Sequence, residues 1–151
     1  MDNLTLMLHA TFGLLFILAC LWVFVDTLNV SEANVARIRS LSVGIAVLMW
    51  VTYLIGGYWY VTSYAPEKAL ILKGPWPFAH GFFMETKEHV VLMVVLLATF
   101  LPVLASNDMI RNKGIRSLML WVTGLMIVIG ISMEGAGAII SMGAKVALLP
   151  N

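Results

Sequence analysis

The residues whose chemistry stands out in this 151-residue sequence are gathered in one segment, residues 75–91, which reads PWPFAHGFFMETKEHVV. It holds two of the three histidines and three closely spaced charges beside a long apolar run. If the chain is helical from Phe82 onward, Glu85 and His89 lie one turn apart on the same face and Lys87 faces away from them. A carboxylate and an imidazole at the end of a membrane helix cost free energy unless they are paired, bound to a ligand or hydrated. The segment is therefore the first candidate for a functional site.

The elements that must position these residues are apolar helices. The sequence is 61% hydrophobic and 11% charged, whereas soluble domains are about 45–50% apolar and about 25% charged. A helix that crosses a hydrocarbon core of ~30 Å needs about 20 apolar residues. Four segments are apolar over such a length, at about residues 4–28, 41–61, 82–105 and 118–140.

These segments predict an all-α integral membrane protein, formed by one domain over residues 1–151. We expect an up-down four-helix transmembrane bundle with residues 62–81 as a long outer loop, because Pro66, Pro75 and Pro77 favour a surface segment over a helix. Helices 1 and 3 of such a bundle are diagonal neighbours.

Basic residues predict how the bundle is oriented. The two short loops between helices 1 and 2 and between helices 3 and 4 carry five basic residues, against four on the other side. Because short basic loops stay on the cytoplasmic side, we expect both termini outside, in the inner cell membrane, with the site facing the periplasmic or extracellular side. No basic block remains that would favour binding to nucleic acid.

In this topology the polar residues of the apolar segments converge on one membrane level near the outer face. His9 lies near the start of the first helix, and Glu134 stands within the glycine-rich run GISMEGAGA of the fourth. The residues at this level are His9, His80, Glu85, Glu88, His89 and Glu134. Their common level predicts a single binding site.

Two histidines at equal depth on diagonal helices are the ligands that a b-type haem needs. We expect His9 and His89 to bind one haem from its two faces, with Gly13 and Gly137 leaving room for the ring edge between helices. His80 is expected to have a secondary role, such as a hydrogen bond to a haem propionate. Cys20 is the only cysteine, so the CxxCH attachment of a c-type haem is excluded.

In its plan, this arrangement resembles the membrane b-type cytochromes, which hold haem between facing helices of a four-helix bundle. The resemblance implies a small electron-transfer protein or subunit rather than a stand-alone enzyme, with other membrane or periplasmic redox proteins as partners, in a homo- or hetero-oligomer. Glu134 is the residue we expect to handle protons at the site, because it is the one acid within an apolar helix.

Two other functions fit the same residues. His9, His89, Glu85 and Glu88 could bind a single iron, copper or zinc ion, because imidazole and carboxylate suit these metals. The chain could also be a non-catalytic accessory or assembly subunit, with its polar residues paired to a partner protein or to its own loop. Sequence alone leaves the three functions open.

Overall fold

The computed structural model describes residues 2–149, and over this range every regular element is helical. Four α-helices and one short π-helix follow one another along the chain. The elements are α1 (Asp2–Leu28), α2 (Val35–Lys73), η1 (Ala79–Met84), α3 (Glu85–Ala105) and α4 (Lys113–Ala147). Four helical segments are long and apolar enough to cross a membrane. η1 and α3 together form one of these segments, and α1, α2 and α4 provide the other three.

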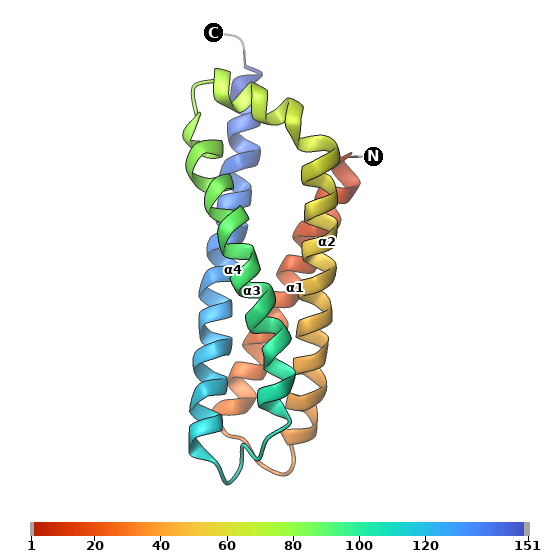
Figure 1. Cartoon of the computed structure of the whole chain (residues 1–151), viewed down its shortest axis with the longest axis vertical. Helices are drawn as coiled ribbons and strands as arrows, with labels where there is room; N and C mark the ends of the chain where they lie inside the picture. The colour runs from red at the N-terminus through yellow and green to blue at the C-terminus, as the bar shows by residue number, and fades with distance from the viewer. Residues whose placement is uncertain (1, 150–151) are drawn as a thin grey trace.

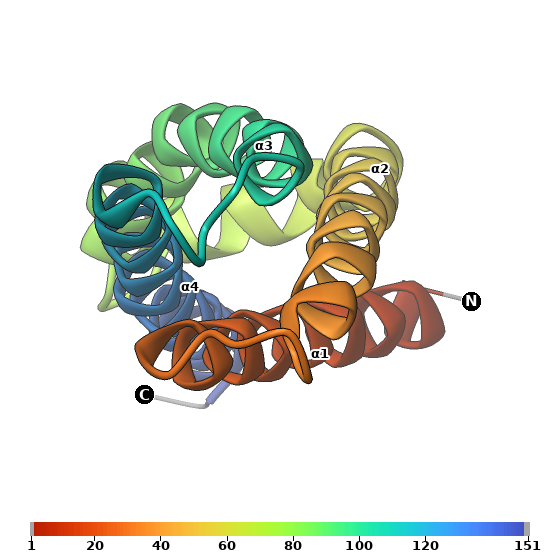
Figure 2. The same cartoon turned by 90° about the horizontal axis from the view of Figure 1, so that it is seen from below.

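The helices form an up-down bundle in chain order around a common axis, as Figures 1 and 2 show. Each helix packs beside the next, and α4 closes the ring against α1. Among the described residues α1 and α3 make no direct helix contact, so they are the diagonal pair that the sequence predicts. The two ends of the chain lie at the same end of the bundle (Figure 1), which we call the terminal end.

The segment expected as an outer loop is mostly helical. α2 runs on to Lys73, so residues 62–73 of the expected loop belong to it, and only residues 74–78 connect it to η1. Pro66 lies inside α2, where it removes one backbone hydrogen bond and bends the helix. Beyond the bend the end of α2 crosses the terminal end of the bundle (Figure 1). The expectation of a loop was wrong because proline was read as a helix terminator.

The π-helix η1 is held by close contact with α4. A Cβ built at Gly143 of α4 would lie 2.7 Å from the Cβ of Ala79, so only glycine lets η1 approach this closely. The backbone N–H of Glu85 then bonds the carbonyls of His80 and Phe82, which carries the chain from η1 into α3 without a break. The path of the chain through η1 therefore determines which residues at the start of α3 face the interior of the bundle.

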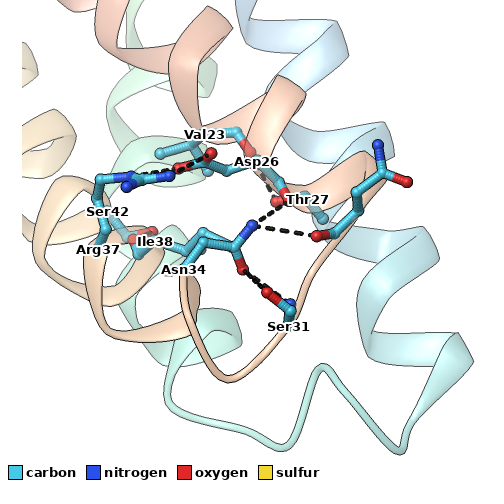
Figure 3. A network of polar contacts seen from close by, with 9 residues as sticks. Val23, Asp26, Thr27, Ser31, Asn34, Arg37, Ile38 and Ser42 are labelled. Carbon is cyan, nitrogen blue, oxygen red and sulfur yellow. Dashed lines mark hydrogen bonds and ion pairs between the residues drawn. The ribbon is translucent and has the colours of Figure 1, made fainter.

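A polar network fixes the opposite end of the bundle, where α1 turns into α2 (Figure 3). Arg37 of α2 donates two hydrogen bonds of 2.8 Å to the carboxylate of Asp26 of α1. The Asn34 side chain donates to the carbonyls of Asp26 and Asn29 and accepts from the N–H of Ser31. α4 begins at Lys113, five residues earlier than expected, because the Asn112 side chain accepts hydrogen bonds from the N–H groups of Gly114 and Ile115 in its first turn, at 3.0 and 3.2 Å.

Two apolar clusters fill the bundle at different heights. The larger contains Cys20, Ile38 and Met126, and the smaller, near the terminal end, contains Trp59, Tyr64 and Ile140. Of the candidate site residues, His80 packs into the smaller cluster beside Tyr64.

Candidate functional site

A cavity of about 360 Å³ lies between these clusters, with walls from all four α-helices and from η1. We call it the main cavity. Most of its wall is apolar or aromatic. The ionisable and hydroxyl side chains in the wall are His9, Tyr53, Tyr60, Lys87, Glu88 and Ser141. A cavity of this size, apolar with a few polar groups, matches small-molecule and cofactor sites, which measure roughly 300–1,000 Å³.

The main cavity opens sideways between α2 and α3. Val61 of α2 and Leu92 of α3 both line it, yet they are 81% and 53% exposed on the outside of the bundle. Part of the cavity wall therefore reaches the apolar outer surface of the bundle. His9 of α1, on the far side of the ring from α3, marks its inner end.

His9 is held in a defined orientation by α2. Its Nδ1 lies 2.9 Å from the carbonyl oxygen of Thr52, and because a carbonyl can only accept, Nδ1 carries the proton. The ring lies against Gly56, where a built Cβ would be 2.6 Å from two of its atoms. Nε2 makes no hydrogen bond with the described residues, and the His9 side chain lines both the main cavity and a smaller one. An imidazole anchored in this way presents a free Nε2 lone pair, as metal-binding histidines do.

Glu88 of α3 presents a carboxylate oxygen without a partner. Its Oε1 is, among the residues the structure describes, the one buried side-chain nitrogen or oxygen that makes no hydrogen bond. The carboxylate interacts with the hydroxyl of Tyr60 across the cavity, from α2. A buried acceptor of this kind is costly unless a ligand or water supplies a donor.

A second, small cavity of about 50 Å³ continues from the inner end of the main one. Lys87 of α3 and Glu134 of α4 both line it, together with His9, and the two charges interact electrostatically without a direct salt bridge. The wall of this cavity is mostly apolar, and His9, Lys87 and Glu134 supply its ionisable groups. Its volume is large enough for an ordered water molecule. Cation, carboxylate and imidazole therefore line one small cavity inside the bundle.

Glycines make room for these charged groups. The Glu134 carboxylate lies directly against Gly13 of α1, where any Cβ would overlap it. The Lys87 ammonium lies over Gly137 of α4, 3.2 Å from a Cβ built there. The sequence predicted Gly13 and Gly137 as space for a haem edge, and in the structure they accommodate the Lys87 and Glu134 side chains.

His89 lies away from the cavities, so the structure does not bring it together with His9. It is exposed on the outer side of α3, and its Nδ1 lies 2.6 Å from the backbone carbonyl of Glu85 in its own helix. The start of α3 is set by η1, and this turns Lys87 and Glu88 inward and His89 outward. The expected arrangement of His9 and His89 facing each other is therefore not found.

His80 is a buried part of the smaller apolar cluster rather than a residue at the end of a loop. It is 3% exposed, its Nδ1 lies 3.0 Å from the Tyr64 hydroxyl, and its Nε2 lies 3.6 Å from Glu85. It lines neither cavity. Its contacts join η1, α2 and α3, which is a structural role.

The residues expected to bind a metal ion are likewise dispersed. His9 lines the inner end of the main cavity, Glu88 faces it from α3, and Glu85 and His89 are exposed. Within residues 2–149 no group of three or more histidine, cysteine, aspartate or glutamate side chains is close enough to hold a metal ion.

Several site residues were not expected from the sequence. Lys87 was placed on the opposite face from the site, whereas it lines both cavities. Met84 and Met133 add two thioether sulfurs to the main cavity. Apolar residue types at helical spacing carry no signal that separates a cavity wall from packed core, so these two could not have been found.

Comparisons with models of protein families, with curated proteins and with solved structures returned no match for this chain.

Proposed function

We propose that this chain is a multi-pass protein of the inner cell membrane that transfers electrons through one non-covalent b-type haem, held in the main cavity by His9. Both termini and the terminal end of the bundle lie outside, on the periplasmic or extracellular side. Electrons are exchanged with other membrane or periplasmic redox proteins. The lengths and apolar character of the four spans support the membrane location.

The observation that carries the proposal is the anchoring of His9. Its Nδ1 proton is committed to the Thr52 carbonyl, which leaves Nε2 without a partner among the described residues in a side chain that lines a cavity with mainly apolar walls. Histidine imidazole is a common ligand of haem iron. Met84 and Met133 line the same cavity, and a thioether sulfur would supply the second ligand that, together with histidine, is used by electron-transfer cytochromes. We therefore propose His9 as the histidine ligand and assign no ligand role to His89.

Glu134 and Lys87 support a role in handling protons. Both line the small cavity beside His9, and they are joined there by a space large enough for water. Reduction of a group in the main cavity adds negative charge, and a nearby site that binds a proton compensates it. We propose that Glu134 is the group that takes up this proton.

An absorption spectrum of the protein purified in detergent after expression with adequate haem tests the proposal. We expect a Soret band and about one haem for each chain. If the band is absent and metal analysis finds iron, copper or zinc, the chain binds a metal ion directly. If both are absent, the chain is an accessory or assembly subunit.

A further inference from the structure

We propose that the end of the bundle opposite the terminal end binds an anionic phospholipid, with Lys113 and Arg116 of α4 holding its phosphate group. This is the end where α1 turns into α2 and α3 turns into α4 (Figure 1), and we call it the loop end. The site is separate from both cavities, because neither basic residue lines them. Lipid binding there goes beyond the proposed electron transfer and does not depend on haem.

The loop end carries an excess of positive charge. Its five basic and three acidic residues are Arg37, Arg39, Arg111, Lys113 and Arg116, against Asp26, Glu32 and Asp108. Arg37 occupies Asp26 with two hydrogen bonds of 2.8 Å, and Arg111 lies 3.9 Å from Asp108. Among the described residues no carboxylate forms an ion pair with Arg39, Lys113 or Arg116. These three cations are therefore available to an anion from outside the chain.

Two of the three cations are held at the ends of neighbouring helices. Arg116 donates a hydrogen bond to the carbonyl of Leu28, the last residue of α1. Arg39 of α2 donates through Nε to the carbonyl of Ala105, the last residue of α3, at 3.0 Å. A guanidinium has five N–H donors, so each retains donors for another acceptor. Because these helices span the membrane, their ends lie at the level of the lipid head groups.

Lys113 adds a second cation next to Arg116. The two residues are three positions apart on α4 and are therefore neighbours on its surface. Lys113 is exposed, and the first turn of α4 contains no acid that would offset the repulsion between the two charges. A phosphate between them would accept charge-assisted hydrogen bonds from both. Arg39 contacts the end of α3 instead, and so we assign it no part in this site.

The apolar surface of α1 beside this pair indicates a lipid rather than a soluble anion. Leu21 and Leu28 are seven residues apart, which places them on one face of α1, and they are 45% and 43% exposed. Phe24, between them in the sequence, faces α4, where a Cβ built at Gly124 would lie 3.4 Å from its ring. The exposed leucines thus run along α1 beside its contact with α4, starting at the carbonyl that Arg116 binds. An acyl chain can cover these leucines, whereas free phosphate or an acidic protein segment at the head-group level would leave them uncovered.

Native mass spectrometry of the full chain in detergent, titrated with dioleoylphosphatidylglycerol and with dioleoylphosphatidylcholine, tests the inference. Each basic residue near a membrane surface strengthens binding of anionic lipid about fivefold. The Kd of the anionic lipid should therefore be roughly 10- to 30-fold lower than that of the zwitterionic one. Lys113→Gln and Arg116→Gln should each reduce this preference about fivefold. Arg116→Lys keeps the charge and should keep most of the preference, although it loses the guanidinium that binds Leu28.

Lys145→Gln is the matched control, because Lys145 is an exposed lysine in the last turn of the same helix, at the terminal end. This variant should keep the wild-type preference, and an equal volume of inorganic phosphate at the lipid concentration should not displace the bound lipid. Equal affinity of the wild-type protein for the two lipids would overturn the inference and leave an acidic protein segment as the partner of the loop end. Wild-type preference in both glutamine variants, an equal loss in Lys145→Gln, or displacement by phosphate would also overturn it. The titration reads lipid binding alone, so its result stands whether or not the protein carries haem.

Discussion

Gly56→Ala is expected to remove haem from the protein while leaving the bundle folded. A Cβ at this position would lie 2.6 Å from two ring atoms of His9. The imidazole would have to leave its place against α2 and lose its hydrogen bond to the Thr52 carbonyl. Loss of such an orienting contact lowers the affinity for a metal by roughly 10- to 100-fold. Haem content of the purified variant, measured from the Soret band, checks this result.

Gly57→Ala is the matched control. Gly57 is the next residue of α2 and also lines the main cavity, but a Cβ built there meets no atom within 4 Å. This variant should bind as much haem as the wild-type protein. Equal haem content in the two variants would mean that the packing of the His9 ring against Gly56 does not contribute to haem binding.

Lys87→Met is expected to destabilise the bundle strongly, by about 3 kcal/mol, because it leaves the Glu134 charge without its cation inside a membrane-spanning domain. An unpaired carboxylate can escape this penalty by binding a proton. The loss of stability should therefore shrink as the pH falls. The midpoint of thermal unfolding in detergent, followed at several pH values, measures both effects.

A double variant shows whether the two charges act as a pair. Adding Glu134→Leu to Lys87→Met removes the unpaired charge, so it should recover much of the lost stability. Lys145→Met is the control for loss of a lysine, because Lys145 is exposed in the last turn of α4, and it should change the midpoint little. Glu134→Leu alone completes the cycle, and if the loss of stability in the double variant equals the sum of the losses in the two single variants, Lys87 and Glu134 are independent of each other.

The number and order of the helices could be predicted from the sequence, because apolar runs of spanning length are a strong signal. The diagonal placement of α1 and α3 followed from short connections between sequential helices. The ends of the helices were harder to predict from the sequence. α4 begins earlier because of the Asn112 cap, and α2 continues past Pro66 because its end packs across the bundle.

The site could be predicted only in part. His9 and Glu134 stood out as polar residues in apolar helices, and both line the small cavity. Which face each residue of the segment 79–91 occupies depends on the π-helix η1, whose wider turn shifts the faces of α3 relative to a continuous α-helix. An assumed regular helix therefore placed His89 in the site and Lys87 outside it, whereas the structure has the reverse.

The glycines of α1 and α4 were expected to make room for a haem, and in the structure charged side chains lie against them. Small residues in α1 and α4 indicated close approach of some group. Sequence spacing cannot tell whether that group is a cofactor ring or a neighbouring side chain. In the structure, the groups against Gly13 and Gly137 are the Glu134 carboxylate and the Lys87 ammonium.

The most direct test of the central proposal, that His9 and not His89 binds the haem, is the haem content of His9→Ala and His89→Ala, each purified in the same detergent and measured by its Soret absorbance per chain. His9 lines the main cavity with a free Nε2, and His89 is exposed on the outer side of α3. We predict that His9→Ala contains almost no haem and that His89→Ala contains as much as the wild-type protein. Loss of haem from His89→Ala, or full retention by His9→Ala, would contradict the proposal.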